Sequence, residues 1–390
     1  MSSGEGSVGL TVAIVGAYGG VGRVVAESLA VAERPTPALL LGGRDLAPAQ
    51  ALATELGGGA QAAECDVFDA ASLAAFCERA DVVVNCAGPY TRVLDRVARA
   101  AHAAGAHYVD PGGAAETYRR LEPLAPEIAA ASRSFVLGAG LIEGGSGLIA
   151  WYASAVAEAA FDEVSSLDLY FGDLEEWSPA ASEDILADAF DGEALGWYRG
   201  GAWKRLGQLG ALRAGARVDL PRPFGAGTFV MPHFRVELTR LATERPYGRV
   251  ASFIVPQLSA RTLPRWGYIR AVSLVNPQHA AASLGALMRD ETKRYGAGSV
   301  IQAVVKGRRG GDDARLRVTE SDTRGYWITG VTCALATEAV LGGEAAPGLA
   351  YLCDAVDPVA FVHALVDRGL TIASEIDDAP VDASALLSVD

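Results

Sequence analysis

The chain has no long hydrophobic run, no clustered cysteines and few positive charges. No stretch of about 18 uninterrupted apolar residues occurs, so we expect no membrane span. The five cysteines are scattered without a Cys-x-x-Cys pair, which argues against a disulfide framework and a structural zinc site and favours a cytoplasmic protein. No H-E-x-x-H or EF-hand pattern occurs either, so we expect no metal. The net charge of −14 speaks against nucleic acid as a partner.

What the chain does have is a glycine turn near its start. Residues 12–22 read V-A-I-V-G-A-Y-G-G-V-G, an apolar run followed by glycines and then by a helical pattern. Glycines let the backbone approach a phosphate closely, and the free N–H groups at a helix start supply donors. An ordinary glycine turn is the alternative, but the strand before it and the helix after it favour a dinucleotide site. The residues expected to bind the cofactor here are Gly16, Ala17, Tyr18, Gly19, Gly20, Val21 and Gly22.

The end of the next apolar run indicates which dinucleotide binds. Arg44 stands there, where an NAD-selective site would place a carboxylate to accept from the ribose 2′-hydroxyl. A guanidinium instead suits a 2′-phosphate, so we predict NADP(H). Asp45 follows directly and is expected at the start of the helix at 46–56. The alternative for Arg44 is a solvated loop cation.

Strand and helix signals alternate through residues 1–145, which is typical of a Rossmann-type doubly wound parallel sheet. In such α/β folds the ligand binds at the carboxyl ends of the strands. Besides the turn and Arg44, the strand ends predicted to bind the cofactor hold Asp66, Val67, Cys86, Ala87, Gly88, Pro89 and Tyr90.

The second part of the chain has a different pattern. Residues 146–325 are expected to form a mixed α+β substrate domain, and residues 326–390 a C-terminal helical segment. Residues 173–226 are rich in glycine, proline and charge and are expected to form long loops. The strands predicted in this domain cover 165–171, 229–239, 249–255, 268–275, 300–306 and 315–320.

Charge is unevenly distributed in this second part. Residues 162–193 hold 11 acidic residues and no lysine or arginine, whereas residues 199–270 hold 13 lysines or arginines against three acids. One interpretation is that the two blocks neutralise each other within one domain. The other is that the basic block lines a site for an anionic substrate or an acidic carrier protein.

The chain resembles the saccharopine dehydrogenase-like family of NADP-binding oxidoreductases. The likeness lies in V-G-A-Y-G-G-V-G at 15–22, V-V-N-C-A-G-P-Y at 83–90 and A-A-G-A-H-Y-V-D at 103–110. Further residues recur in the family's order toward the end of the chain, namely Tyr326, Thr329, Leu341, Gly343, Gly348, Asp357, Pro358, Phe361, Leu365 and Gly369. The resemblance implies a Rossmann domain, a second domain whose sheet covers the cofactor, a C-terminal return to the first domain, and a homodimer.

Two departures from the family pattern concern acidic residues. Relatives often have D-L-T-G-E after the H-Y-V-D segment, whereas this chain has Asp110-Pro-Gly-Gly-Ala-Ala-Glu116, so carrying that role over to Glu116 is doubtful. Relatives also often have a proline after the last Rossmann strand, where this chain has Ile142-Glu143-Gly-Gly.

Hydride transfer needs a group that gives or takes a proton near the nicotinamide. Tyr90 either orients the substrate and relays a proton or packs its ring against the cofactor. Asp110 either acts as base and orients an ammonium or caps the turn that follows it. Glu143 is a third catalytic candidate, and His233 and Arg235 are predicted to hold a substrate carboxylate.

The leading hypothesis is hydride transfer to or from an imine or secondary amine formed from an amino acid and an oxo acid. The resemblance equally covers enzymes that reduce carbon–carbon double bonds on carrier-bound acyl chains, so a trans-acting enoyl reductase is the first alternative. An NADP-binding regulatory protein is the second alternative.

Overall fold

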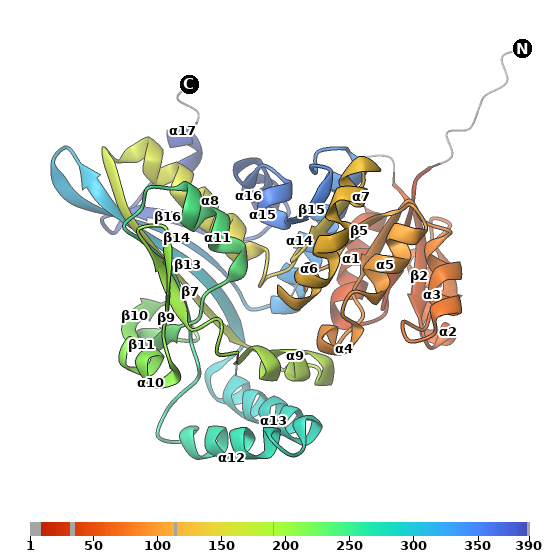
Figure 1. Ribbon diagram of the computed structural model, residues 1–390, viewed down its shortest axis with the longest axis horizontal. Helices are drawn as coiled ribbons and strands as arrows, with labels where there is room; N and C mark the ends of the chain where they lie inside the picture. Colours follow the sequence, from red (N-terminus) through yellow and green to blue (C-terminus); the bar gives the residue numbers. More distant parts are fainter. Residues whose placement is uncertain (1–8, 32–35, 113–114, 190, 388–390) are drawn as a thin grey trace, which may run out of the picture. The chain divides into compact units, whose positions relative to one another are not determined.

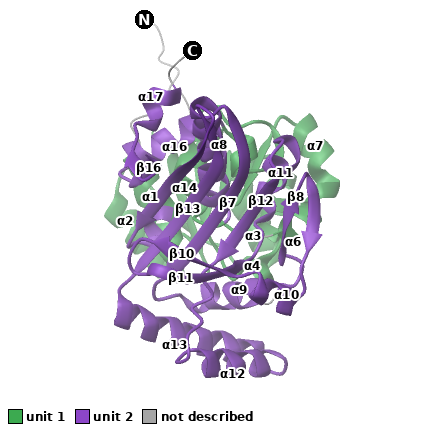
Figure 2. Cartoon of the chain, turned by 90° about the vertical axis from the view of Figure 1, so that its left-hand side faces the viewer, with its two compact units in different colours: residues 1–142, 329–356 green, residues 143–328, 357–390 purple. Residues whose placement is uncertain are grey.

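The computed structural model describes residues 9–31, 36–112, 115–189 and 191–387, so the first eight residues lie outside the described part. The chain divides into two compact units (Figure 2). Unit 1 runs up to residue 142 and includes Thr329–Val356, and unit 2 holds Glu143–Ile328 and the chain from Asp357 onward. These bounds lie close to the predicted ones at 145 and 325, but the C-terminal segment is shared between the units.

Unit 1 contains a seven-stranded sheet in the order β15-β6-β5-β4-β1-β2-β3, and every neighbouring pair is parallel. The apolar run Val12–Val15 is at most 1 % exposed, as expected for a central strand with helices on both faces. The chain order reverses between β1 and β4, where a doubly wound sheet binds its ligand. The predicted Rossmann-type fold is therefore confirmed. Its strands are β1 (Thr11–Val15), β2 (Ala38–Gly43), β3 (Gln61–Glu64), β4 (Val82–Asn85), β5 (His107–Val109), β6 (Ser134–Leu137) and β15 (Gly348–Tyr351).

Helices connect these strands (Figure 1). In chain order they are α1 (Gly20–Ala30), α2 (Leu46–Leu56), α3 (Ala70–Cys77), α4 (Tyr90–Val93), α5 (Arg96–Ala103), α6 (Ala115–Leu121), the 3₁₀ turn η1 (Glu122–Leu124), α7 (Ala125–Ala130) and α15 (Leu352–Ala355). Helix α14 (Gly325–Leu341) begins in unit 2 and continues into unit 1.

Unit 2 contains a ten-stranded mixed sheet, which confirms the predicted second α+β domain. Its main path is β10-β11-β12-β7-β13-β14-β16-β17, and β8 and β9 branch from β12. Strand β7 pairs in parallel with β12 and antiparallel with β13. The strands are β7 (Glu163–Leu174), β8 (Gly196–Arg199), β9 (Ala202–Arg205), β10 (Ala216–Leu220), β11 (Gly225–Pro232), β12 (Arg249–Ile254), β13 (Gly298–Arg309), β14 (Asp312–Asp322), β16 (Ile372–Ile376) and β17 (Ala379–Pro380).

The long helix α8 (Gly145–Ala160) packs on β7, β13 and β14 of this sheet. A second core lies around helices α9, α12 and α13, with Leu186, Ile269 and Leu284 buried in it. The helical segments of unit 2 besides α8 are α9 (Pro179–Ala189), α10 (Gln208–Arg213), η2 (Val236–Leu238), α11 (Thr239–Glu244), α12 (Leu263–Ser273), α13 (Pro277–Tyr295), α16 (Pro358–Asp367) and α17 (Ala383–Leu387). Among the described helices, none is long and apolar enough to cross a membrane.

Three predictions about unit 2 are wrong. Of residues 229–239, predicted as one strand, only 229–232 belong to β11, and 236–238 form η2. Residues 268–275, predicted as a strand, lie mostly in helix α12. Trp266, Ile269 and Val272 recur every three residues and pack together in the α12–α13 core, so helical spacing outweighed the local run of apolar residues. Residues 173–226, predicted as long loops, contain a helix of eleven residues and the short elements β8, β9, α10 and β10.

Candidate functional site

The glycine turn is built so that a side chain would not fit at its key positions. Gly16 has a φ of +76°, and a Cβ there would lie 2.9 Å from the backbone nitrogen of Ala87. A Cβ on Gly22 would lie 2.3 Å from the carbonyl oxygen of Gly16. The N–H groups of Gly16 and Ala17 donate to the carbonyl of Gly42 at 2.9 and 3.0 Å, which fastens the turn to β2. The sequence uses glycine here because the backbones meet.

The start of α1 offers donors to an anion. Gly19 is its N-cap and has no side chain to accept from the first N–H groups, and the first turn carries no acidic residue. Unsatisfied N–H groups and the helix dipole favour a phosphate at such an end. The turn and helix therefore fit the pyrophosphate of a dinucleotide.

The β4 end lies against this turn. Cys86 donates its N–H to the carbonyl of Val15 at 2.8 Å, and Ala87 donates to the side-chain oxygen of Asn85 at 3.1 Å. The segment from Cys86 to Tyr90, predicted separately from the glycine turn, is thus brought beside it within unit 1.

The β2 end carries Arg44 in an exposed position, and its guanidinium has no ion pair with any residue that the structure describes. Asp45 is the N-cap of α2, as predicted, but its side chain accepts no capping hydrogen bond. Its N–H donates to the hydroxyl of Tyr18 at 3.1 Å. Tyr18 therefore reaches from the glycine turn to the residue after Arg44.

The β3 end positions the next predicted pair. Asp66 accepts from the N–H of Phe68 at 2.9 Å and donates its own N–H to Ser72 at 3.1 Å, while Val67 is 8 % exposed. Cys65 donates to the carbonyl of Gly43 at 3.0 Å, which joins this end to that of β2. Cofactor binding by Asp66 and Val67 stays a prediction.

Asp110 at the β5 end is buried in a hydrogen-bond chain. Asn85 donates to the hydroxyl of Tyr108 at 3.3 Å, and that hydroxyl donates to Asp110 Oδ2 at 2.9 Å. Gly138 at the end of β6 donates its N–H to Asp110 Oδ1 at 3.3 Å. Burial, together with the nearby carboxylate, raises the pKa of Tyr108 well above its usual value, so it stays a neutral donor. Asp110 thus joins three strand ends, a role that the sequence did not reveal.

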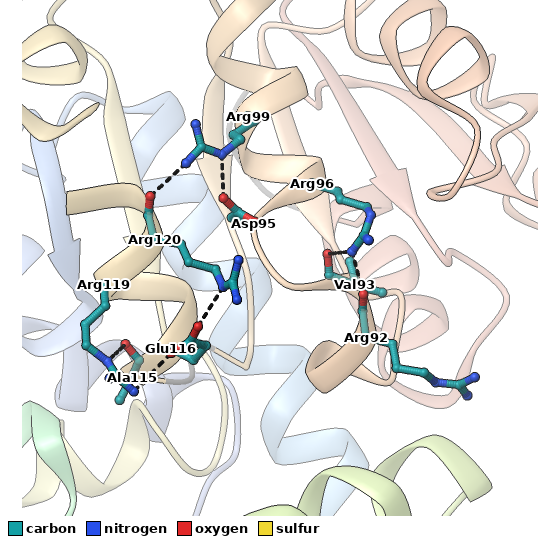
Figure 3. A network of polar contacts seen from close by, with 9 residues as sticks. All are labelled: Arg92, Val93, Asp95, Arg96, Arg99, Ala115, Glu116, Arg119 and Arg120. Atoms are coloured by element: carbon teal, nitrogen blue, oxygen red, sulfur yellow. Dashed lines mark hydrogen bonds and ion pairs between the residues drawn. The ribbon is translucent and has the colours of Figure 1, made fainter. Parts of the chain in front are cut away.

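Tyr90 begins the short helix α4, which a neighbouring arginine holds in place (Figure 3). Arg96 Nη1 donates to the carbonyls of Arg92 and Val93 at 2.6 and 3.1 Å, so it satisfies the C-terminal end of α4. The same guanidinium lies 5.3 Å from the ring centre of Phe68. Tyr90 itself lies beside Gly112, where a Cβ would be 3.2 Å from its ring. Its catalytic role stays a prediction.

Glu116 lies on the surface of α6 and pairs with two arginines of the same helix (Figure 3). Arg120 Nε lies 2.7 Å and Arg119 Nη2 3.1 Å from its carboxylate oxygens. Arg99, paired with Asp95, also donates to the carbonyl of Arg120 at 2.8 Å. This helical pairing explains Glu116 without a role in catalysis, in line with the departure from the family pattern.

The predicted residues of unit 2 lie in one buried polar cluster. His233 and Arg235, 2 % and 6 % exposed, follow β11, and Arg235 Nη2 donates to Asp188 Oδ2 at 2.9 Å. His233 Nδ1 lies 2.6 Å from the same nitrogen, and burial lowers the pKa of this histidine. Glu143, predicted as catalytic, is close enough for its charge to help raise the pKa of Arg235. The structure thus brings Glu143 near the predicted pair His233 and Arg235, from which it was predicted separately.

Two members of this cluster were missed from the sequence. Glu237 accepts from the N–H of Gly144 at 3.2 Å and from the hydroxyl of Ser146, and burial raises its pKa to about 7. Asp188 has its pKa held below the usual range by Arg235 and His233, although burial acts in the opposite sense. The only available signals were the position of Glu237 two residues after Arg235 and that of Asp188 in the acidic block. Substrate binding by His233 and Arg235 stays a prediction.

The acidic and basic blocks neutralise each other in several places. Besides Asp188 and Arg235, Glu193 pairs with Arg205 at 2.6 Å, and the buried Asp168 pairs with Arg249. These contacts support the structural interpretation of the two blocks over a broadly cationic binding surface.

Comparisons with known proteins agree with this geometry. Residues 12–137 match the family model of the saccharopine dehydrogenase NADP binding domain. Among solved structures, apo saccharopine dehydrogenase (L-Glu forming) from Saccharomyces cerevisiae is similar, with a TM-score of 0.68 and 18 % identity over 94 % of this chain and 100 % of that one. A probable dehydrogenase from Thermotoga maritima has a TM-score of 0.50 and 11 % identity over 93 % and 98 %. These likenesses show the fold. No curated protein matches the chain.

Proposed function

We propose that this chain, whose residues 12–137 belong to the saccharopine dehydrogenase family of NADP-binding domains, is an NADP(H)-dependent oxidoreductase acting at a C–N bond. The substrate class would be an imine or secondary amine derived from an amino acid. The observation that carries the proposal is the family match over a domain whose turn, helix start and exposed arginine together fit the cofactor NADP(H).

The residues of unit 1 would hold the cofactor from end to end. The N–H groups of the 16–22 turn and of α1 would bind the pyrophosphate, and Arg44 the 2′-phosphate. The segment from Cys86 to Tyr90 would lie along the nicotinamide ribose. When bound, the nicotinamide supplies or accepts the hydride.

Proton transfer and substrate orientation would fall to the predicted side chains. Tyr90 lies at the start of a short helix at the β4 end, and its phenol would donate or relay a proton. Asp110 accepts from both Tyr108 and Gly138, so we assign it the positioning of the β5 and β6 ends. Within unit 2, Glu143 and the cluster around Arg235 would bind the carboxylate of an anionic substrate.

The family resemblance leaves a second substrate class in competition, the carrier-bound enoyl thioesters. Three further proposals are a homodimer, from the family resemblance, an acidic carrier protein, from the basic block, and a cytoplasmic location, from the scattered cysteines. The pairing of the basic block with the acidic block gives an acidic carrier less exposed positive charge to dock on, which is why we rank the amine substrate first.

The test is NADPH consumption with panels of amine plus oxo-acid pairs and of carrier-bound enoyl thioesters. We expect turnover with at least one amine and oxo-acid pair. Turnover of the thioesters alone would replace the proposal with the enoyl reductase. Tight NADPH binding without turnover of either panel would favour an NADP-binding regulatory protein.

A further inference from the structure

We propose that Tyr18 determines the choice of cofactor, its phenol acting with Arg44 as the second donor to the 2′-phosphate. The proposal concerns the NADP(H) site described above. In a G-x-G-x-x-G turn a glycine would stand at this place, so the chain has put a large polar side chain where the motif has none.

The ring of Tyr18 lies directly over Gly43, the residue before Arg44. A Cβ on Gly43 would lie 2.2 Å from Tyr18 Cε1, 2.8 Å from Cζ and 2.9 Å from Oη. Only a glycine at 43 admits the ring in this position. The two residues thus fit each other across the gap between the glycine turn and the β2 end.

The phenol oxygen is anchored as an acceptor. The N–H of Asp45 donates to it at 3.1 Å, which fixes the hydroxyl beside the turn that carries Arg44. A tyrosine hydroxyl has one proton of its own to donate, and no acceptor for it is found among the described residues. Tyr18 is 36 % exposed, so this donor is accessible to a ligand.

Arg44 completes the donor set. It is exposed and makes no ion pair within the described part of the chain. A guanidinium from Arg44 and a hydroxyl held at the backbone of the next residue suit a phosphate group, which accepts several hydrogen bonds at once. A ribose 2′-hydroxyl would gain much less from two donors, because it accepts few and carries no charge.

Asp45 provides the competing explanation. If its carboxylate accepted from a ribose 2′-hydroxyl, the site would prefer NADH, as acidic residues at this strand end do. In our proposal the Tyr18 hydroxyl, which accepts from the Asp45 N–H, meets the ligand together with Arg44. In the competing explanation the Asp45 carboxylate, which makes no capping bond, meets it instead. The two explanations therefore predict opposite effects of substitution.

The experiment compares Tyr18→Phe with the unchanged protein by fluorescence titration of NADPH and NADH, without any substrate. Adenosine 2′,5′-bisphosphate and adenosine 5′-monophosphate serve as competitors. We expect Tyr18→Phe to weaken NADPH and the bisphosphate about three- to tenfold, the range of one net hydrogen bond, and to leave NADH and the monophosphate unchanged. Tyr268→Phe, an exposed tyrosine on α12 that bonds His279, is the matched control and should change nothing.

A second variant tests the fit over Gly43. Gly43→Ala should displace the Tyr18 ring and reproduce the loss of NADPH affinity, and adding Tyr18→Phe to it should cost little more, because one contact is lost in both cases. Equal weakening of NADPH and NADH by Tyr18→Phe, or no weakening of either, would overturn the proposal. So would tighter binding of NADH than of NADPH together with weaker NADH binding in Asp45→Asn, which is the result that the competing explanation predicts. Since no turnover is measured, an NADPH-selective protein without reductase activity would contradict the proposed function and leave this inference standing.

Discussion

The positive charge of Arg44 is expected to favour NADPH over NADH. Its guanidinium is exposed and has no ion pair among the described residues, and we propose that the 2′-phosphate of the cofactor binds it. We expect NADPH to bind at least tenfold more tightly than NADH, about 1.4 kcal/mol, and Arg44→Ala to reduce that preference. Fluorescence titration of both nucleotides measures this. Arg79→Ala, an exposed arginine of the same unit that bonds Gln61, is the control that should keep the preference.

The position of Asp110 at a strand end was predictable from the sequence, but its hydrogen-bond partners were not. Its place at a strand end followed from the alternating pattern, but two of the partners of its carboxylate, Tyr108 and Gly138, come from its own strand and from the end of the neighbouring one. Hydrogen bonds across parallel strands depend on strand order, which local patterns do not encode. The sequence therefore left a base and a turn cap as alternatives, and neither included this network.

Removing the Asp110 carboxylate should destabilise unit 1. In Asp110→Ala the buried Tyr108 hydroxyl and the Gly138 N–H lose their acceptor, so we expect the free energy of unfolding to fall by about 1–3 kcal/mol. Urea denaturation measures the loss. Tyr108→Phe, which removes a donor and leaves the carboxylate its bond from Gly138, should cost less. An Asp110→Ala variant of unchanged stability would show that the network contributes nothing to folding.

At the scale of elements, predictions were most accurate in unit 1. Its buried parallel strands are short apolar runs separated by helices, so each element is marked in the sequence by its own composition. In unit 2, α12 is apolar toward its core and also exposes Leu263 and Tyr268, so no clear polar face marked it as a helix. The helical spacing of Trp266, Ile269 and Val272 was present in the sequence, but the exposed apolar residues of the same helix obscured it.

Helix caps offer a matched pair for measurement. The side chain of Asp357, the N-cap of α16, accepts from the N–H groups of Val359 and Ala360 at 2.8 and 2.9 Å. The side chain of Asp45, the N-cap of α2, accepts no hydrogen bond from the first N–H groups of its own helix. Asp357→Ala should therefore lower the free energy of unfolding by about 1 kcal/mol, within the usual range of 0.5–2 kcal/mol for a cap. Asp45→Ala should lower it by only a few tenths of a kcal/mol, through the helix dipole alone. Thermal and urea unfolding of both variants compare them, and equal losses would contradict the geometric distinction.

At the scale of the whole molecule, the sequence showed charge blocks but not their pairing. Asp168 and Arg249 are 81 residues apart, and they meet because β7 and β12 are neighbours in the sheet. The division into units is also discontinuous, since α14 leads the chain back to unit 1. Both features depend on contacts between distant segments, whereas the glycine turn and Arg44 belong to local motifs and were recognisable directly.

Buried carboxyl groups should make the whole molecule less stable as the pH rises. Glu320 on β14 is 2 % exposed, neither of its oxygens has a partner among the described residues, and burial raises its pKa to about 7. Burial also raises the pKa of Glu237 to about 7 and that of Glu175 to about 8. Between the usual carboxyl pKa and these values the folded chain holds protons that the unfolded chain has released. Stability from these groups is therefore present at low pH and is lost as the pH rises toward 8.

Glu320→Gln separates one of these groups from the rest. The amide keeps the size of the side chain and cannot ionise, so the free energy of unfolding should fall less steeply between pH 5 and 8 than in the unchanged protein. One group can account for at most about 1.4 kcal/mol per pH unit. Urea denaturation across this pH range gives the slopes, and Glu78→Gln, at an exposed position, should leave the slope unchanged. If Glu320→Gln gives the same slope as the unchanged protein, Glu320 ionises in the folded chain at its ordinary pKa, and another buried carboxyl group must carry the pH dependence.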